Sequence, residues 1–412
     1  MTWPRLLAAG ALLLAGTLAL GGDNTKLAPY AQSKSGPTKS NMYFPIAVRA
    51  YEQWQYGLPK SETYFPIAVW LQDPSWAPGY QQAGINLYLG LWQGPTEDQL
   101  TQLAQYGMPV ICDQNDVGLA HLMDPTIVGW TIDPDEPDNA QELPSGDGYG
   151  PPVLPSTILA EYEQLCAADP TRPVFLNLGQ GVAWDGYIGR GTRTGHDEDY
   201  PLYCEGCDVA SFDIYPVADD DPAVNGQLYL VGQGVERLVT YSGGTKPVWN
   251  CIECTDINGT GKATPQEIRA EVWMSLVNGS RGLIYFVHQF LPTFDDHALL
   301  DDPVNLAAVT AINHQIMQLA PVLNSPTVLG ALTVESSNAS VPVAAMVKKC
   351  RGRTYVFAVA TQPGVTDVTF TLAGLRRYAQ IEVLGEGRIV SATVGTFRDQ
   401  FNEWDVHLYQ VK

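Results

Sequence analysis

Eight short apolar runs, separated by turns and helix-forming stretches, constrain the fold of this chain more than any other feature. The runs are FPIAVWL from Phe65, INLYLGLW from Ile85, PVICDQ from Pro109, IVGWTID from Ile127, PVFLNLG from Pro173, VASFDIYP from Val209, PVWNCIE from Pro247 and GLIYFVH from Gly282. Because they are apolar almost throughout, they are typical of strands buried on both faces, as in a parallel sheet. The sequence therefore predicts an α/β fold.

Helical stretches lie between many of these runs. They are TEDQLTQLAQYG from Thr96, STILAEYEQLCAADP from Ser156, TPQEIRAEVWMSLVNG from Thr264 and NLAAVTAINHQIMQL from Asn305. The third begins with a capping box, in which Thr264 is followed by Pro265 and Glu267. Eight strand–helix units over residues 63–320 match the roughly 250 residues of a (β/α)₈ (TIM) barrel. An open doubly wound sheet is disfavoured because no glycine-rich phosphate fingerprint follows the first run.

A local repeat leaves two candidates for the first strand. KSNMYFPIAV begins at Lys39 and KSETYFPIAV begins at Lys60, and the two copies differ at only two positions. The second copy is followed by the next apolar run at a distance suited to a barrel. We therefore place the first barrel strand in the second copy.

The sequence pattern changes after Pro321. Short alternating segments follow: TVLGALTVES, VPVAAMVKKC, RTYVFAVATQ, VTDVTFTLAG, AQIEVLGEGRIV and WDVHLYQVK. Alternation of this kind, broken by turns, is typical of antiparallel strands. Residues 321–412 are predicted to form a small C-terminal antiparallel β-sandwich that packs on the barrel.

The N-terminal sequence predicts a targeting segment. Arg5 precedes an apolar run from Leu6 to Leu20, and small residues follow at Gly21 and Gly22. This pattern predicts a secretory signal peptide over residues 1–22 and a linker over residues 23–62. The apolar run is shorter than the roughly 20 residues of a spanning helix, so no membrane anchor is expected. The protein is expected to be secreted or periplasmic.

The charge balance limits the class of partner. Asp and Glu number 44 against 23 Lys and Arg, and the net charge is −21. Such a chain repels nucleic acid and anionic membrane surfaces, so neither is an expected partner. The 10 Trp and 20 Tyr residues supply aromatic faces that suit the apolar faces of sugars. A neutral carbohydrate is therefore the favoured partner.

Polar residues at the carboxyl ends of the strands are the candidates for chemistry, because catalytic groups of such barrels lie there. The ends carry Trp92, Gln114, Asp135, Glu136, Asn177, Asp213, Tyr215, Glu253 and His288. This rim is acidic and rich in amides, and it lacks the basic cluster of a phosphate site. Glu136 and Glu253 follow the fourth and seventh strands, which face each other across a barrel mouth. Two facing carboxyls suit glycoside hydrolysis.

These residues carry a resemblance to the clan A glycoside hydrolases, which include the family 5 cellulases and the family 42 β-galactosidases. The DEP of Asp135–Pro137 resembles their fourth-strand NEP motif, FDIYP ending at Pro216 resembles their sixth-strand motif, and VWNCIE ending at Glu253 resembles their nucleophile strand. The resemblance covers residues 63–320. It implies a retaining β-glycosidase with Glu136 as acid/base, Glu253 as nucleophile and Tyr215 beside it.

The resemblance has departures. Asp135 stands where the clan usually has Asn, no Arg marks the second strand, and His288 and Phe286 replace the usual Trp of the eighth. The other substrate-binding candidates are Asp135, Asn177, Gln114, Trp92, Asp213 and His288. No metal or cofactor is expected.

Three alternatives stay open. The barrel could be catalytically silent and bind a polysaccharide or a partner protein, because fold alone does not prove function. Hydrolysis could instead proceed through Asp133 and Asp213, with both Glu residues structural. The segment Asp256–Glu267 nearly fits a calcium-binding loop, although Glu267 is already explained as a capping-box residue.

Overall fold

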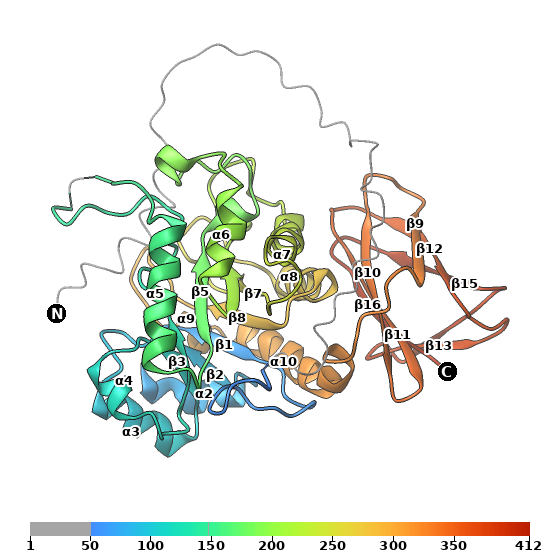
Figure 1. The fold of residues 1–412 in the computed structure, drawn as a ribbon. Helices are drawn as coiled ribbons and strands as arrows, with labels where there is room; N and C mark the ends of the chain where they lie inside the picture. Colours follow the sequence, from blue (N-terminus) through green and yellow to red (C-terminus); the bar gives the residue numbers. More distant parts are fainter. Residues whose placement is uncertain (1–50, 147) are drawn as a thin grey trace, which may run out of the picture.

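A computed structural model describes residues 51–146 and 148–412. The predicted signal peptide, the first copy of the repeat and residues 23–50 of the predicted linker lie outside the described residues. Figure 1 shows the barrel on the left and the C-terminal β-domain on the right. Both parts of the predicted fold class are confirmed.

Eight parallel strands form the barrel, in the order β6-β5-β4-β3-β2-β1-β8-β7. They are β1 (Ile67–Trp70), β2 (Leu87–Leu89), β3 (Val110–Cys112), β4 (Ile127–Thr131), β5 (Val174–Leu178), β6 (Val209–Phe212), β7 (Trp249–Glu253) and β8 (Gly282–Phe286). Each coincides with one predicted apolar run, and β1 lies in the second copy of the repeat. Ala210 N–H donates to Pro247 O at 3.1 Å and brings β6 against β7, which closes the ring.

Helices surround these strands. They are α2 (Ala77–Gln82), α3 (Glu97–Tyr106), α4 (Asp116–Ala120), α5 (Pro155–Ala168), α6 (Asp199–Glu205), α7 (Tyr229–Tyr241), α8 (Pro265–Asn278), α9 (Ala298–Asp301) and α10 (Pro303–Leu323). The capping box at Thr264 is confirmed. Within the described ranges, α10 alone is long and apolar enough to span a bilayer. It packs against α8 and strand β10 (Val343–Cys350), which explains its apolar character.

Side chains fill the barrel interior. Alternate residues such as Leu87, Ile111, Phe175 and Trp249 form one buried cluster inside the ring. Part of the predicted linker closes its N-terminal end: residues 51–62 form turns, and Leu58 belongs to this cluster. The Trp249 indole N–H donates to the Tyr51 hydroxyl at 2.8 Å. The turns of residues 51–62 thus close the base of the barrel, and the carboxyl ends of the strands lie at its other end.

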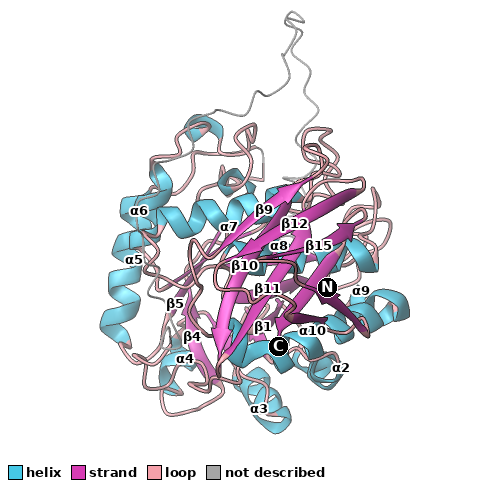
Figure 2. Cartoon of the chain, turned by 90° about the vertical axis from the view of Figure 1, so that its right-hand side faces the viewer, coloured by secondary structure: helices cyan, strands magenta, loops and turns pink. Residues whose placement is uncertain are grey.

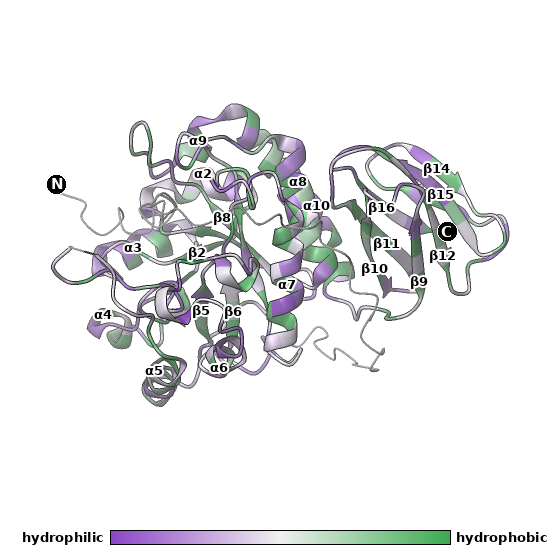
Figure 3. Cartoon of the chain, turned by 90° about the horizontal axis from the view of Figure 1, so that it is seen from above, coloured by the Kyte–Doolittle hydropathy of each residue, from purple (hydrophilic) through white to green (hydrophobic). Residues whose placement is uncertain are grey.

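The C-terminal domain is a two-sheet antiparallel sandwich. One sheet has the order β10-β11-β16-β13-β14 and the other β15-β12-β9. The further strands are β9 (Leu332–Ser336), β11 (Arg353–Ala360), β12 (Thr366–Leu372), β13 (Gln380–Val383), β14 (Arg388–Ser391), β15 (Thr396–Phe401) and β16 (Val406–Val411). Figure 2 shows the smaller sheet in front of the larger one. The larger sheet packs on α8 and α10, which lie between barrel and sandwich (Figure 3). Strand β15 was not predicted.

Candidate functional site

A small cavity lies at the carboxyl ends of the barrel strands. Its lining comes from β1, β5, β7 and β8 and from the loops after β4, β6 and β8. The lining residues are Trp70, Asp135, Glu136, Asn177, Asp213, Tyr215, Cys251, Phe286 and Phe290. Its volume is about 30 Å³, which has room for water but not for a sugar ring. A larger substrate must therefore enter from the rim, where Asp135 is exposed to solvent.

The loop after β4 holds Glu136 in an unusual conformation. Its backbone φ is +47°, which is left-handed and costly for a residue with a side chain. The Asn139 amide donates to Glu136 Oε1 at 2.9 Å. Asp138 anchors the same loop, because its carboxylate accepts the Gly179 N–H at 2.8 Å. These contacts fix the Glu136 carboxyl in the cavity wall.

Glu136 and Asp213 form a hydrogen-bonded pair of carboxyls. Burial, reinforced by the charges of Asp213 and Asp135, raises the pKa of Glu136 well above its usual value. Burial also raises the pKa of Asp213 to about 6, while hydrogen bonds from Glu136 and Tyr215 oppose that shift. The hydrogen bond between them raises the pKa of Glu136 and lowers that of Asp213, so Glu136 is the donor of the pair and Asp213 the acceptor. Such a pair can donate a proton and supply a carboxylate at one place.

Asp135 completes the acidic group. Desolvation and the charge of Asp213 raise the pKa of Asp135, although part of the Asp135 side chain still reaches solvent. The Asn177 amide donates to Asp135 Oδ1 at 3.2 Å, and the buried Asn177 carbonyl oxygen has no protein partner among the described residues. That oxygen can accept a hydrogen bond from a ligand hydroxyl.

Aromatic rings form another part of the cavity wall, and Tyr215 is hydrogen-bonded to Asp213. Tyr215 and Phe286 lie 5.0 Å apart between ring centroids, and Phe290 lies 6.2 Å from Phe286. Trp70, at the end of β1, also contributes to the wall. A polar floor beside an aromatic wall suits a ligand that has both hydroxyl groups and apolar faces.

Five of the nine residues predicted from strand ends line this cavity: Asp135, Glu136, Asn177, Asp213 and Tyr215. Three others do not line it. The Gln114 amide donates to Leu165 O of α5 at 3.1 Å. Trp92 O accepts the Gln99 amide at 3.0 Å, at the start of α3. His288 is buried beside Phe290 and Phe294, and its burial lowers its pKa to about 4.

Glu253, the predicted nucleophile, does not line the cavity. It is fully buried, and its two carboxylate oxygens accept the N–H groups of Val217 at 2.7 Å and Ala218 at 2.8 Å. Glu271 of α8, also fully buried, is hydrogen-bonded to Glu253. Burial raises the pKa of Glu253 to about 7. Glu253 therefore braces the loop that follows Asp213 and Tyr215.

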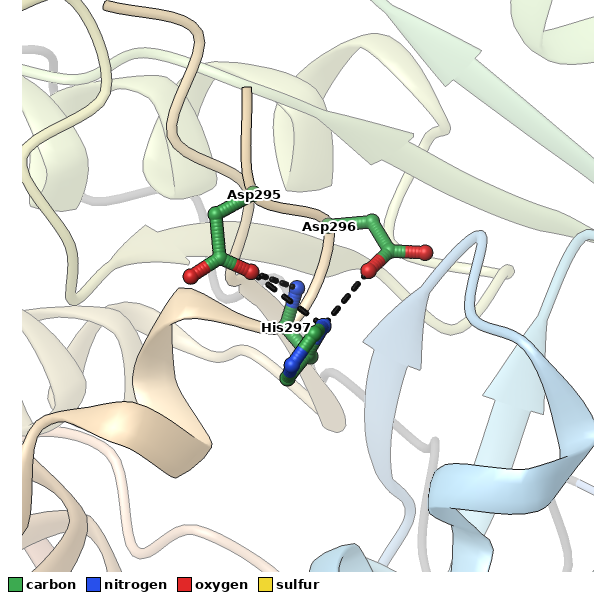
Figure 4. A group of neighbouring side chains, drawn as sticks. All are labelled: Asp295, Asp296 and His297. Atoms are coloured by element: carbon green, nitrogen blue, oxygen red, sulfur yellow. Dashed lines mark hydrogen bonds and ion pairs between the residues drawn. The ribbon is translucent and has the colours of Figure 1, made fainter. Parts of the chain in front are cut away.

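An acidic cluster lies in the loop between β8 and α9. Figure 4 shows Asp295 and Asp296 turned toward the His297 ring. His297 Nδ1 lies 2.6 Å from Asp296 and 3.2 Å from Asp295, and the ring stacks on Trp76. These contacts account for the cluster as an ion-paired group. In the possible calcium loop, Glu267 instead accepts the Thr264 N–H and hydroxyl, each at 2.8 Å.

Several residues of the site had no signal in the sequence analysis. Cys251 and Phe290 line the cavity, and Asn139 and Asp138 hold the Glu136 loop. Strand alternation could have indicated Cys251, because it lies two residues before Glu253 and faces the barrel interior with Trp249. Asn139 and Phe290 lie in irregular loops, where no periodicity indicates direction.

Fold and site together define a class of protein: a (β/α)₈ barrel with a paired-carboxyl cavity and a C-terminal β-sandwich. No protein-family model matches the sequence, and no curated protein matches it. Among solved structures, the chain is similar to AmyP in complex with maltotriose at a TM-score of 0.51 and 10% identity, covering 86% of this chain and 98% of that one. This likeness shows a shared fold that spans both domains.

Two further solved structures resemble the chain more loosely. One is an α-amylase from Geobacillus thermoleovorans complexed with acarbose, at a TM-score of 0.43 and 10% identity, covering 87% and 99% of the two chains. The other is a GH30 endoxylanase from Clostridium papyrosolvens, at a TM-score of 0.45 and 10% identity, covering 84% and 96%.

Proposed function

We propose that this protein is a glycoside hydrolase in which Glu136 donates a proton to the glycosidic oxygen. The hydrogen-bonded pair of Glu136 and Asp213 carries this proposal, because it places a proton-donating and a proton-accepting carboxyl in one cavity. The aromatic wall and the unpartnered Asn177 oxygen favour a sugar. The shared fold with a protein that binds maltotriose supports the same class of substrate.

In this mechanism the glycosidic oxygen replaces Asp213 as the acceptor of the Glu136 proton. As the bond between the anomeric carbon and that oxygen breaks, Glu136 transfers its proton to the leaving group. The Asp213 carboxylate then stabilises the positive charge that develops on the sugar and takes a proton from the water that attacks the anomeric carbon. Because catalytic carboxyls of glycosidases lie about 5–9.5 Å apart, the bound sugar must separate Asp213 from Glu136. This assignment favours Asp213 over Glu253 as second carboxylate, because Asp213 shares the cavity with Glu136.

The type of glycosidic bond, the stereochemical outcome and export of the protein are proposed from the sequence. A β-glycosidic bond, retention of configuration and Glu253 as nucleophile are what the clan A resemblance implies. Export through the segment over residues 1–22 is likewise inferred from the sequence alone. We therefore design the test so that it distinguishes Asp213 from Glu253 as the second carboxylate.

The test is release of reducing sugar from a panel of α- and β-linked glycans and aryl glycosides. Wild type is compared with Glu136→Gln, Asp213→Asn and Glu253→Gln, and circular dichroism verifies that each variant folds. Glu136→Gln and Asp213→Asn are expected to lower kcat by about 10²–10⁴-fold, the usual contribution of a general acid or base. Glu142→Gln, in an exposed loop, is the matched control and is expected to retain full activity.

Full activity of Asp213→Asn beside an inactive, folded Glu253→Gln would return the second role to Glu253. Absence of release by wild type across the panel, with glycans still bound on an array, would favour the silent carbohydrate-binding barrel.

A further inference from the structure

A second cavity lies at the opposite end of the barrel, where its base meets the β-sandwich. It is bounded by α7, the C-terminus of α8, the residue before β8 and strand β10. Its volume is about 350 Å³, within the range of about 300–1,000 Å³ that small-molecule sites occupy. Figure 3 shows α7, α8 and α10 on the side of the barrel that faces the sandwich. Junctions between domains are common places for ligand sites.

The cavity wall is aliphatic. It includes Val239, Leu276, Val277, Leu323, Leu329 and Met346, and none of the lining residues is aromatic. Branched aliphatic chains and a flexible Met adapt to a linear alkyl chain better than to a sugar ring. Leu329 is 54% exposed and lies on the wall, so the cavity has an apolar mouth.

Basic residues converge on this apolar space. Arg281 and Lys348 line it, against one carboxylate, that of the exposed Glu236. Lys246 also lines it, but its ammonium donates to Cys204 O and Cys207 O. The excess of cations is notable because the chain as a whole has a net charge of −21. An anion bound here would meet a local potential opposite to that of the whole molecule.

Lys348 is the central cation. It is only 2% exposed, and its ammonium donates to Leu323 O at 3.0 Å and Ser325 O at 2.8 Å. An ammonium carries three N–H donors, and these two carbonyls take two of them. Within the described ranges, no carboxylate lies within ion-pair distance of Lys348. A buried ammonium without a charged partner is costly, and a carboxylate would offset that cost.

Arg281 adds to the effect of Lys348. Its guanidinium donates to the same carbonyl oxygen, Leu323 O, at 2.8 Å, which places the two cations close together. Burial and this neighbouring charge lower the pKa of Lys348 well below its usual value. A carboxylate placed between the two side chains would favour the charged form of Lys348.

We propose that this cavity binds an aliphatic carboxylate. The carboxylate accepts the remaining Lys348 N–H beside Arg281, and the alkyl chain lies among Leu276, Leu329 and Met346. The site is separate from the carboxyl pair of Glu136 and Asp213 at the other end of the barrel, so the inference does not depend on glycosidase activity.

The test is isothermal titration calorimetry of the purified full chain with octanoate. Saturable binding is expected, and Lys348→Met is expected to weaken it at least tenfold. The neighbouring residue Lys349 is exposed, so Lys349→Met makes the same change of charge outside the cavity and is expected to leave binding unchanged. The neutral analogue 1-octanol is expected to bind wild type at least tenfold more weakly than octanoate.

A variant that is expected to strengthen binding separates the proposal from simple damage to the fold, because damage would only weaken binding. Glu236→Gln removes the one lining carboxylate from an exposed helix position and is expected to tighten octanoate binding several-fold. The proposal is overturned if wild type shows no saturable heat, if octanol binds as tightly as octanoate, or if Lys349→Met weakens binding as much as Lys348→Met.

Discussion

At the scale of single residues, the functional character of this protein rests on the unequal environments of a few carboxyls. Glu136 and Asp213 share one cavity, but the hydrogen bond between them raises the pKa of Glu136 and lowers that of Asp213. Glu253 has backbone N–H donors on both oxygens, which satisfies it as a structural group. Identical side-chain chemistry thus takes different roles because the local partners differ.

A change at Asp135 tests the electrostatic coupling directly. Asp135→Asn removes a like charge beside Glu136, so the pKa of Glu136 is expected to fall. The alkaline limb of the kcat/KM profile should then move to lower pH. Asp133→Asn is the control, because Asp133 is an exposed acid in the same loop. An unchanged alkaline limb in Asp135→Asn would show that the charge of Asp135 does not raise the pKa of Glu136.

At the scale of elements, the loops after the strands position the site through contacts with one another. The loop after β4 is held by the end of β5, since Asp138 binds Gly179 N–H and Asn139 lies against Gly179. The loop after β6 is held by β7 through Glu253. The cavity therefore depends on side-chain and backbone pairs that lie about 35 to 40 residues apart in the sequence.

Gly179→Ala tests the first of these contacts. A Cβ at position 179 would lie 2.5–2.8 Å from atoms of the Asn139 side chain, too close for real atoms. Asn139 must move, and Glu136 then loses its amide donor. We expect kcat to fall by about tenfold or more while the far-ultraviolet circular dichroism stays unchanged, because small displacements of catalytic groups are costly. Gly150→Ala is the control for a generic glycine replacement, because Gly150 is not left-handed and a Cβ there would meet only the end of the exposed Leu143 side chain, at 3.3 Å, and a backbone oxygen at 3.7 Å.

The buried pair of Glu253 and Glu271 makes stability depend on pH. Burial raises both pKa values in the folded protein, to about 7 for Glu253, from an ordinary value of 4.5. The folded state therefore holds protons that the unfolded state releases. This contribution is complete below about pH 4.5 and is lost as the pH rises toward 7. At about 1.4 kcal/mol per pKa unit, the loss for Glu253 is on the order of 3 kcal/mol.

Glu271→Gln is expected to flatten this dependence. A neutral amide can donate to the Glu253 carboxylate, which lowers its pKa toward the ordinary value. Urea unfolding measured between pH 4.5 and 7 should show a smaller decrease in the variant than in wild type. Glu163→Gln, on the exposed face of α5, should leave the slope as it is in wild type. A slope in Glu271→Gln as steep as in wild type would contradict the coupling.

At the scale of the whole molecule, barrel and sandwich share a core. Trp273 of α8 and Phe357 of β11 are both fully buried, with ring centroids 5.1 Å apart in an edge-to-face arrangement. Met346, Phe357 and Leu408 of the sandwich belong to the same buried cluster as the outer layer of the barrel. A continuous core predicts that the two domains unfold together.

Phe357→Ala tests this shared core. Removing a buried aromatic ring is expected to cost about 3–5 kcal/mol of unfolding free energy. Because the cluster spans both domains, one cooperative transition should move to lower temperature in calorimetry. Tyr378→Ala, at a side chain 67% exposed, should change stability little. A shift confined to one of two resolved transitions would show that the sandwich unfolds independently.

The sequence by itself determined the order and identity of the barrel strands. Each run is apolar because a strand between helices and barrel interior is buried on both faces, and this signal is local. The same locality revealed the capping box at Thr264 and most strands of the sandwich. Strand β15 was not predicted because Arg398 and Asp399 interrupt its apolar alternation.

Only the tertiary structure decided which strand-end residues share the cavity. Asp135, Glu136, Asn177, Asp213 and Tyr215 meet there, whereas Glu253, an equally plausible strand end, turns to Val217, Ala218 and Glu271. A strand places the backbone of its last residue, but the direction of that side chain depends on partners distant in sequence. The cavity between the domains was invisible for the same reason, since its walls come from segments as far apart as α7 and β10.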